Sequence, residues 1–510
     1  MENKTKIRVC VIGGGAGGLI CSKRLLEKKN IIVESYERSN NVGGLWVYDD
    51  GPNGKMYTSL RANTCKILMA FPEYPMPEEW PEFPSHWMMA EYLQGFANTF
   101  LKGVYRTSTT ILGWDKIKSN NNNSNSNNSF QYKVYYKKTN NNKISNDDEH
   151  VQPSFAIYDK IVICSGQASI PFTPNYKGIE TFKGRIFHSS EYRNSSLFPK
   201  RRVMVCGAGY ASGSDICQDV SFAAKQTYLS SRRGFGVTKR FAFGKDLAMG
   251  PHGPAWRQYV PGYNTFNRYI TMKISEWMKY LELGDQPKKF GYRPYDRKID
   301  GKKVFSFVTD SNHILHRISL GAVKVVPDIE EIYEHSVKVK DGREIEIDDL
   351  IFATGYNRSF NHQFSKPLNI NGKEKPLRLY NYVFKDDDEN IAFVLACHPV
   401  GPHWPLASLQ SRWIAKVFSG EMGLPNTAEQ EKYMRIVKNH QAESIVYCFS
   451  EIERLGKSLG WDRPTLLQLL NWYWTDYEAY NKYMNAPEWY GWFNKDHFGE
   501  LDIAVHTSKL

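Results

Sequence analysis

The chain has 510 residues, which is enough for two or more domains with substantial cores. Its content of 41% hydrophobic and 14% aromatic residues is typical of a globular protein and excludes a disordered chain. The formal net charge is +12, but no run of five Lys or Arg residues occurs. The composition therefore argues against a nucleic-acid-binding tail and leaves a generally basic surface or phosphate-bearing cofactors to explain the charge.

The cysteines and histidines predict no metal site. The eight cysteines are scattered without a CxxC pair or a zinc spacing, which indicates a reducing compartment. Cys10, Cys164 and Cys206 fall in apolar, strand-like runs and are expected to be buried thiols. His313 and His316 are three positions apart, but no Cys or further His completes a ligand set, so we expect them at the surface.

The two ends of the sequence bear on location. The first nine residues lack the apolar core of a signal peptide, and no run of 18 apolar residues predicts a membrane span. The last three residues, Ser508-Lys509-Leu510, match the address that an import receptor reads on peroxisomal proteins. We therefore expect a peroxisomal location, and otherwise a cytoplasmic one.

The segment Val9–Leu19 predicts a buried strand, a glycine turn and a helix. Gly13, Gly15 and Gly18 match G-x-G-x-x-G, in which the first glycine makes the turn, the second admits a pyrophosphate and the third lets the helix pack close to the strand. The amides at the start of the helix would bind that pyrophosphate. The next strand ends in Glu37, 24 positions after Gly13, where an acid binds the ribose of an adenosine.

Four features follow before residue 101. Gly43-Gly44-Leu45-Trp46 suits a backbone that passes close to a flat ring system. Asn63 and Thr64 are expected in a loop. The proline-rich stretch over residues 71–83 predicts an ordered loop, and the apolar spacing over 88–100 predicts a helix.

Low-complexity polar runs occupy residues 119–129 and 139–150 and are expected to be disordered loops. They bracket residues 130–138, which alternate like a strand and predict a surface β-meander. Residues 158–166 then predict a buried strand that ends in a small-residue turn.

The segment Arg202–Gly213 repeats the opening pattern of strand, glycine turn and helix. Gly207 and Gly209 are the first two glycines, and the helix is expected from about Ser212. Ser212 stands where the third glycine would be, and Gly213 follows it.

The two units differ in charge at the end of their second strand. Arg232 lies 25 positions after Gly207, so Ser231 and Arg232 replace the acid of the first unit. The guanidinium group of an arginine binds a 2′-phosphate, which an acid would repel. The first unit is therefore predicted to bind FAD, and the second NADPH.

The rest of the chain is less informative about chemistry. Residues 319–332 and 336–347 are expected to be strands. Residues 349–356 predict a strand that ends in a Thr354-Gly355 turn, as in the first unit. Apolar residues on one face predict a helix over 408–420.

Two aromatic-rich regions carry open alternatives. Residues 234–304 either form an insertion that lines a substrate entrance or pack in an ordinary core. The aromatic tail from Thr465 is expected to pack in the core or in an interface.

Residues Phe182–Tyr192 match F-x-G-x-x-x-H-x-x-x-Y, which resembles the identifying motif of flavin-containing monooxygenases. The resemblance covers about residues 7–425 in the same order. Baeyer–Villiger monooxygenases have Trp where Tyr192 stands, which argues against that branch. The other matching pieces are Glu37-Arg38, Gly43-Gly44-Leu45-Trp46, Ala62-Asn63-Thr64, Ala211-Ser212-Gly213-Ser214-Asp215, Phe352-Ala353-Thr354-Gly355-Tyr356 and Leu409-Gln410-x-Arg412-Trp413.

The resemblance implies an α/β fold with two Rossmann-like dinucleotide-binding domains, in which an NADPH domain is inserted in a FAD domain. The expected ranges are 1–170 and 351–510 for the two parts of the FAD-binding domain and 171–350 for the NADPH-binding domain. The family's reaction would have NADPH reduce FAD, reduced flavin capture O2 as a C4a-hydroperoxide, and a soft nitrogen or sulfur nucleophile take the distal oxygen. Expected partners are thus a small nucleophilic substrate, O2 and a peroxisomal import receptor, with a homo-oligomer left open.

By the same resemblance, Asn63 is the catalytic candidate, as a hydrogen-bonding group near the flavin peroxide and NADP+, and His188 holds the domain linker. An NADPH oxidase or reductase that releases H2O2 on the same fold remains an alternative. A non-catalytic flavoprotein scaffold is another, but the intact glycine turns and Arg232 argue against it.

The candidate cofactor-binding residues are Gly13, Gly14, Gly15, Ala16, Gly17, Gly18, Glu37, Gly44, Leu45, Trp46, Ala62, Asn63, Thr64, Gly207, Gly209, Ser212, Gly213, Ser214, Asp215, Ser231, Arg232, Thr354, Gly355 and Gln410.

Overall fold

The computed structural model describes residues 6–51, 54–71, 73–118, 130–139, 153–168, 170–209, 212–237, 241–242, 245–246, 284, 286–292, 297–299, 302–304, 308–309, 313–357, 377–400, 403–436, 445–459 and 466–477. Several expectations fall outside these residues. They concern the polar runs over 119–129 and 140–150, most of the aromatic segment over 234–304, the tail beyond 477 and the tripeptide Ser508–Leu510.

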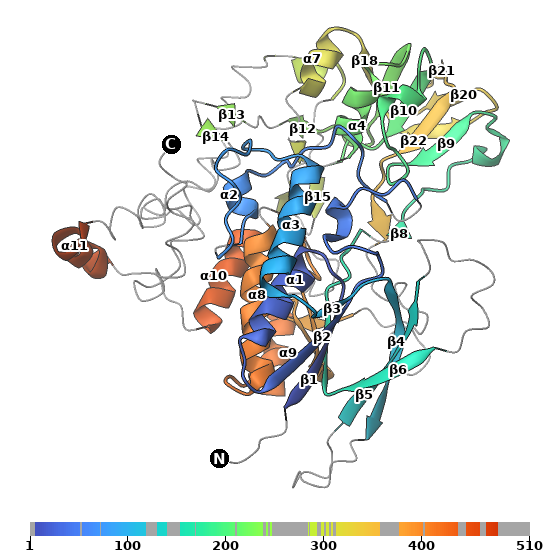
Figure 1. Ribbon diagram of the computed structural model, residues 1–510. Helices are drawn as coiled ribbons and strands as arrows, with labels where there is room; N and C mark the ends of the chain where they lie inside the picture. The colour runs from blue at the N-terminus through green and yellow to red at the C-terminus, as the bar shows by residue number, and fades with distance from the viewer. Residues whose placement is uncertain are drawn as a thin grey trace, which may run out of the picture.

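A seven-stranded sheet carries the first glycine turn, in the lower part of Figure 1. Its core is parallel: β1 pairs with β2 and β7, and β7 pairs with β26. Segments from both ends of the sequence therefore share one sheet. In spatial order its strands are β24 (Leu379–Tyr380), β25 (Phe384–Lys385), β26 (Asp388–Phe393), β7 (Lys160–Ile163), β1 (Ile7–Ile12), β2 (Ile31–Tyr36) and β3 (Tyr105–Arg106).

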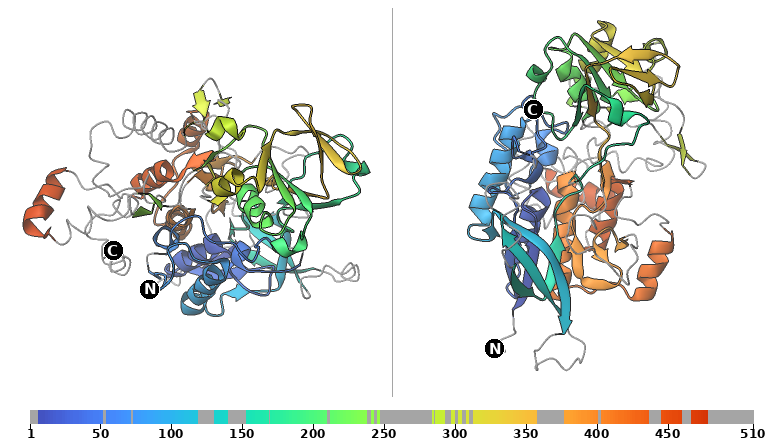
Figure 2. Two further views of the ribbon diagram at one scale, coloured as in Figure 1. Left: turned by 90° about the horizontal axis from the view of Figure 1, so that it is seen from above. Right: turned by 90° about the vertical axis from the view of Figure 1, so that its right-hand side faces the viewer.

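A five-stranded sheet carries the second glycine turn and forms the upper part of the molecule in Figure 1 and in the right-hand view of Figure 2. All four of its strand pairs are parallel. In spatial order its strands are β18 (Val323–Val326), β11 (Gln226–Ser230), β10 (Arg202–Cys206), β22 (Asp349–Phe352) and β9 (Arg185–His188). Because β22 ends at Phe352, this sheet extends two residues beyond the expected boundary at 350.

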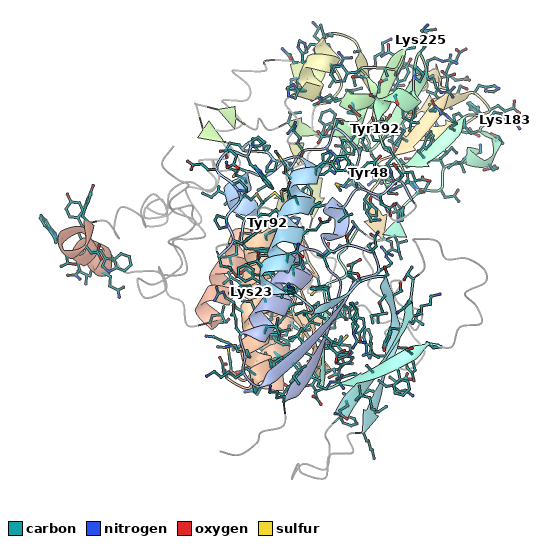
Figure 3. All side chains as sticks on the ribbon, in the orientation of Figure 1. Lys23, Tyr48, Tyr92, Lys183, Tyr192 and Lys225 are labelled. Atoms are coloured by element: carbon teal, nitrogen blue, oxygen red, sulfur yellow. The ribbon has the colours of Figure 1, made fainter. Side chains whose placement is uncertain are left out.

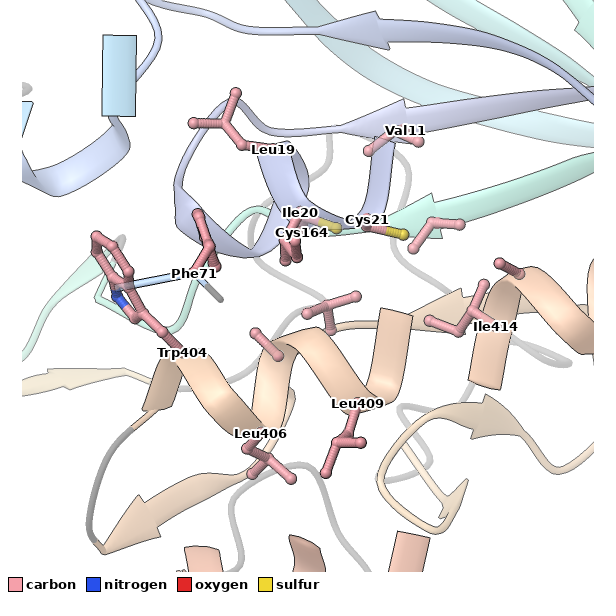
Figure 4. Close-up of a cluster of buried hydrophobic side chains, with 14 of the residues drawn as sticks. Val11, Leu19, Ile20, Cys21, Phe71, Cys164, Trp404, Leu406, Leu409 and Ile414 are labelled. Carbon is pink, nitrogen blue, oxygen red and sulfur yellow. The ribbon is translucent and has the colours of Figure 1, made fainter. Parts of the chain in front are cut away.

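Alternate residues of the central strands enter different cores, as expected for a sheet covered on both faces. In β1, Val9 and Val11 pack against helices, whereas Cys10 and Ile12 pack against an antiparallel meander. The helical side is built mainly from α1 (Ala16–Leu26), α3 (His86–Phe100) and α8 (His403–Ser419). Figure 4 shows α1, with Leu19 and Ile20, beside α8, with Leu406, Leu409 and Ile414, and Trp404 beside Phe71. The buried thiols expected at Cys10, Cys164 and Cys206 are confirmed.

The meander is the expected one: β4 (Thr109–Lys118), β5 (Phe130–Lys138) and β6 (Ser154–Tyr158) pair antiparallel in sequence order. The further elements are η1 (Gly44–Trp46), α2 (Lys66–Met69), β8 (Ile170–Pro171), η3 (Ile179–Thr181), η4 (Ser195–Leu197), α4 (Gly213–Val220), β12 (Gly236–Val237), β13 (Phe241–Ala242), β14 (Lys245–Asp246), α6 (Gln286–Lys289), β15 (Arg297–Ile299), β16 (Lys302–Val304), β17 (Val308–Thr309), α7 (His313–Ser319), β19 (Ile329–Ile332), β20 (Ser336–Val339), β21 (Glu344–Glu346), β23 (Tyr356–Asn357), β27 (His398–Val400), α9 (Thr427–Ile436), β28 (Ile445–Tyr447), α10 (Cys448–Ser458) and α11 (Leu466–Thr475).

Two connections join the sheets, and they pair with each other. β8, on the way to the second sheet, runs antiparallel to β23, on the way back. The N–H of Phe172 also donates to the carbonyl of Gly355 at 2.9 Å. The predicted α/β fold with two Rossmann-like units, one inserted in the other, is confirmed.

The bounds of two expected strands and one expected helix need correction. The strand expected over 336–347 is a hairpin of β20 and β21. The strand expected over 319–332 is two strands, β18 and β19, because Pro327 breaks the ladder between them, and Ser319 ends helix α7 instead. The helix expected from Ser408 begins at His403. In the tail, Trp472 is buried and Trp474 on the same helix is 80% exposed, so packing in an interface stays a prediction for this region. None of the helices among the described residues has the length and apolar character of a membrane span.

Candidate active site

Both glycine turns open into one cavity with a volume of about 1060 Å³. This volume is at the upper end of the range for small-molecule and cofactor pockets, about 300–1,000 Å³. Its wall combines the carboxyl ends of strands from both sheets with the two connections between them. This is the edge at which open α/β sheets bind ligands.

The first glycine turn is shaped by close backbone contacts. Gly13 has φ +111°, and a Cβ there would lie 2.5 Å from the carbonyl oxygen of Cys164. A Cβ on Gly18 would lie 1.9 Å from the carbonyl oxygen of Gly13, so the third glycine has the predicted role of letting the helix approach the strand. Helix α1 begins at Ala16 with Gly15 as its N-cap, which leaves the amides of its first turn open to an anion.

Glu37 lies at the end of β2 beside this turn, as predicted. Its side chain is buried, and both carboxylate oxygens accept backbone hydrogen bonds. Oε2 accepts from the N–H of Gly14 at 2.6 Å, and Oε1 accepts from the N–H of Ser39 at 2.8 Å. The acid therefore holds the turn in addition to lining the cavity.

The second glycine turn repeats this geometry with one difference. Gly207 has φ +104°, and a Cβ there would lie 2.6 Å from the carbonyl oxygen of Ala353. The third glycine is Gly213 and not the position of Ser212, because a Cβ on Gly213 would lie 1.7 Å from the carbonyl oxygen of Gly207. A Cβ on Gly209 would meet no described atom within 4 Å, so the backbone there is open to a ligand.

Ser231 and Arg232 follow β11 and line the cavity beside this second turn. The N–H of Ser231 donates to the carbonyl of Val326 at 3.0 Å, which fixes the backbone of the loop. The Arg232 side chain is exposed. Asp328 lines the same part of the wall and accepts a hydrogen bond from the hydroxyl of Tyr176 at 3.0 Å.

Two further predicted groups line the cavity on the side of the first sheet. Gly44–Trp46 form the short helix η1, and Ala62, Asn63 and Thr64 follow the isolated bridge between Arg61 and Ser85. The Asn63 side chain is partly exposed, and its Oδ1 accepts from the hydroxyl of Thr64 at 3.4 Å.

The motif over Phe182–Tyr192 contacts the returning connection at Gly355 through His188. The histidine does not line the cavity. His188 Nε2 lies 2.9 Å from the carbonyl of Gly355, and Nδ1 lies 2.9 Å from the hydroxyl of Ser190. Because a carbonyl only accepts, Nε2 carries the proton. Burial lowers the pKa of His188, which keeps the ring neutral and agrees with its expected role at the linker. Tyr192, labelled in Figure 3, donates to Asp219 of α4.

Four predicted residues do not line the cavity. Gly18, Gly213 and Ser214 lie in the first turns of helices α1 and α4, behind the glycine turns. Gln410 lies in the interior of α8 and is 1% exposed. Its Oε1 accepts from the backbone N–H of Leu395 at 2.8 Å, so it contacts the chain and not the cavity.

Several further residues line the cavity that were not among the predicted site residues; except for Arg38, which follows Glu37 in a quoted motif, no motif marks them. They are Arg38, Lys55, Met56, Tyr57, Leu60, Arg61, Gln167, Phe172, Tyr176, Asp328, Leu395, His403 and Trp404. Among them, Lys55 lies over the ring of Tyr356, with Nζ 5.0 Å from the ring centroid. Burial, together with Arg38 and Arg193, lowers the pKa of Lys55 to about 8.

These residues fit two dinucleotides. Each unit offers a close glycine turn followed by a helix, and a polar side chain at the end of its second strand. The acid of the first unit and the arginine of the second lie on the same cavity, so the two ligands would meet in it.

The chain was compared with known proteins. Residues 6–457 match the model of the family "Flavin-binding monooxygenase-like". Flavin-containing monooxygenase 5 of Rattus norvegicus is 30% identical over 455 residues, which cover 86% of this chain and 79% of the relative. Among solved structures, S-allyl-L-cysteine S-oxygenase from Allium sativum aligns with a TM-score of 0.62 at 20% identity and covers 99% of each chain. OTEMO in complex with FAD and NADP aligns with a TM-score of 0.60 at 17% identity, covering 85% of this chain and 89% of the other.

The family model spans most of the sequence, including both glycine turns, the motif at 182–192 and helix α8. The two solved structures agree with the fold, with one Rossmann-like unit inserted in another. The chain belongs to the flavin-binding monooxygenase-like family and is a monooxygenase of the flavin-containing type.

Proposed function

We propose that the protein is an NADPH- and O2-dependent monooxygenase that transfers one oxygen atom to a soft nitrogen or sulfur nucleophile. The observation that carries this proposal is the single cavity on which Glu37 and Arg232 both lie, each at the end of a second strand beside a glycine turn. The balanced reaction consumes the substrate, O2, NADPH and a proton, and gives the oxygenated substrate, NADP+ and water. FAD supplies the redox chemistry when it is bound.

FAD is assigned to the first unit. Its pyrophosphate would lie on the amides of the Gly13–Gly17 turn and the first turn of α1, and its ribose would hydrogen-bond Glu37. The turn at Gly44–Trp46 would pass close to the flavin. NADPH is assigned to the second unit, with its pyrophosphate beside Gly209 and its 2′-phosphate on Ser231 and Arg232. A relative in fold, OTEMO, was solved with FAD and NADP, which supports the pair.

Asn63 is assigned to the place where the two cofactors meet the substrate. Its amide carries both a donor and an acceptor, and it lies on the wall of the same cavity as the turn at Gly44–Trp46. The cavity wall also includes Met56, Leu60 and Trp404, whose apolar surfaces would exclude water. The name of a structural relative, S-allyl-L-cysteine S-oxygenase, supports sulfur as one acceptor atom.

The test is a balance of NADPH against products. The purified protein, loaded with FAD, is given a panel of small amines and sulfides, and NADPH loss is compared with oxygenated product and with H2O2. A monooxygenase gives oxygenated product in proportion to NADPH for part of the panel. NADPH loss matched entirely by H2O2 across the panel would support the oxidase alternative instead.

The peroxisomal address stays a prediction, because Ser508–Leu510 lies outside the described residues. Neither the import receptor nor a homo-oligomer is tested by this geometry.

A further inference from the structure

A turn of unusual backbone conformation follows β26 at the wall of the cavity. Leu395 has φ +57°, the left-handed region that residues with a Cβ seldom occupy. Leu395 and its neighbours Val394 and Cys397 line the cavity. A residue held in this region at a ligand site needs surrounding contacts that fix it.

The turn lies at the same sheet edge as the first glycine turn. In the parallel ladder, Ile163 pairs with both Ile12 and Phe393, so the residues that follow all three strands lie in one row. The N–H of Val394 donates to the carbonyl of Ile163 at 3.1 Å. A Cβ on Gly17 would lie 3.2 Å from Cγ1 of Val394, so the turn also contacts the start of α1.

Two glutamine side chains form hydrogen bonds with this turn, one with the N–H and one with the carbonyl of Leu395. Gln410 of α8 accepts the N–H of Leu395 through Oε1 at 2.8 Å. Gln167, which follows β7, donates from Nε2 to the carbonyl of Leu395 at 2.7 Å and to the carbonyl of Cys397. Both backbone groups of the residue with positive φ are therefore bound by side chains.

Gln167 connects the turn to the rest of the cavity. It begins the outgoing connection between the sheets, three residues before β8, and it lines the cavity itself. Gln410 is buried behind the turn. Gln167 thus contacts the turn from the linker, and Gln410 contacts it from helix α8, behind the wall. We call this pair of side chains the clamp.

We propose that Gln410 and Gln167 are positioning residues that hold the backbone of residues 394–397 in the left-handed turn that forms part of the flavin-binding wall. This inference rests on the assignment of FAD to the first unit. It gives Gln410 a role through Leu395 and not through direct contact with a cofactor. Ordinary core packing of Gln410 is the competing account.

A double-mutant cycle separates the two accounts, because glycine occupies positive φ without a Cβ penalty. Gln410→Leu keeps the size of the side chain and removes the acceptor of the Leu395 N–H. We expect it to weaken FAD binding to the apoprotein by about tenfold, and to shift the visible absorption bands of the flavin that does bind. In the background of Leu395→Gly, the same substitution is expected to change the affinity by less than about twofold, since the backbone no longer needs the clamp.

The matched control is Gln430→Leu, since the Gln430 side chain, like that of Gln167, donates to a backbone carbonyl, here that of Pro425, away from the cavity. It is expected to leave the FAD dissociation constant unchanged. Should Gln410→Leu fail to fold, Gln167→Met provides the same cycle from the cavity side, with the same expected loss and the same suppression by Leu395→Gly.

Equal losses in both backgrounds would show that the glutamine acts by packing, and an unchanged FAD affinity would show that the clamp is irrelevant to the flavin. Either result overturns the inference while the wild-type protein still binds FAD. Failure of the wild-type protein to bind FAD would instead overturn the assignment of the first unit.

Discussion

The carboxylate of Glu37 and the backbone amide of Gly14 are joined by a hydrogen bond of 2.6 Å across 23 positions of sequence. The second carboxylate oxygen binds the N–H of Ser39 at 2.8 Å. The acid that would hold a ribose is thus already oriented by the turn that would hold the pyrophosphate. The turn for the pyrophosphate therefore also positions the carboxylate for the ribose.

Replacing Glu37 tests this arrangement. Glu37→Gln keeps the size but leaves one acceptor oxygen for two backbone N–H groups, so the turn and the ribose compete for it. We expect the affinity of the apoprotein for FAD to fall by about tenfold or more, measured by quenching of flavin fluorescence. Glu27→Gln, at the exposed end of α1, is the control. An unchanged dissociation constant for Glu37→Gln would show that the carboxylate is not part of the site.

A substitution at Asp349 tests how much its ion pairs with two arginines stabilise the second sheet. Its side chain is fully buried, and it accepts hydrogen bonds from Arg185 at 2.6 and 2.9 Å and from Arg201 at 2.9 Å. Asp349→Asn leaves both arginines without their carboxylate. We expect the free energy of unfolding to fall by about 2 kcal/mol in denaturant titrations at pH 7. The control Asp341→Asn breaks an exposed pair with Arg343 and is expected to cost less than about 1 kcal/mol.

The effect at Asp349 has a defined pH dependence. Burial alone would raise its pKa, but the hydrogen bonds and charges of Arg185 and Arg201 outweigh burial and hold the pKa below its ordinary value. A depressed carboxyl pKa stabilises the fold above the pKa of the unfolded chain, about 3.9, and the stabilisation is lost as the pH falls through the folded pKa. The difference between wild type and Asp349→Asn should therefore shrink below about pH 4. A difference that stays constant with pH would contradict the ion-pair account.

Asn63 tests the reaction itself. Asn63→Ala is expected to keep FAD and its reduction by NADPH, because the two glycine turns, Glu37 and Arg232, which would anchor the dinucleotides, are unchanged and hydride transfer does not need the Asn63 side chain. Oxygen transfer to the substrate should become less efficient. We expect the ratio of oxygenated product to NADPH consumed to fall by about tenfold, with H2O2 making up the difference. The control is Asn194→Ala, on an exposed turn of the second unit. A normal product ratio in Asn63→Ala would leave Asn63 with a structural role.

The spacing of sequence motifs predicted the site residues whose positions are determined by close backbone packing. Gly13 and Gly18, and the acid at Glu37, are located by the lengths of a strand, a turn and a helix, which vary little between Rossmann units. In the second unit the third glycine comes one residue later than in the first, six positions after Gly207, so Gly213 has the role expected near Ser212. A Cβ on Gly213 would lie 1.7 Å from the carbonyl oxygen of Gly207, and a spacing rule locates this close approach only to within one residue.

Side chains that act through long-range contacts were not predictable in this way. Gln410 matched a family pattern, but its partner Leu395 lies 15 positions away on another element, and only the fold shows that the pair meets behind the cavity. Lys55 belongs to no motif, and its place over Tyr356 follows from the packing of an irregular loop against the returning linker. Such loops carry few periodic signals in the sequence.

The last prediction concerns the choice of nicotinamide cofactor. Arg232 is exposed on the cavity wall at the end of β11, beside the glycine turn assigned to NADPH. A charge-assisted contact with the 2′-phosphate is worth roughly 1.5–3 kcal/mol, or about one to two decades in affinity. Arg232→Ala should therefore raise the KM for NADPH by about tenfold or more and leave the KM for NADH nearly unchanged, because NADH has no 2′-phosphate.

The measurement is steady-state kinetics of flavin-dependent turnover with each nucleotide at saturating O2. Arg343→Ala controls for loss of one positive charge on the same unit, since Arg343 is exposed and pairs with Asp341. It should change both KM values little, because solvent and salt screen a distant surface charge. A solvated Arg232 without a phosphate partner would give small and equal effects on NADPH and NADH. If Arg232→Ala retains the preference for NADPH, the 2′-phosphate is bound elsewhere on the wall.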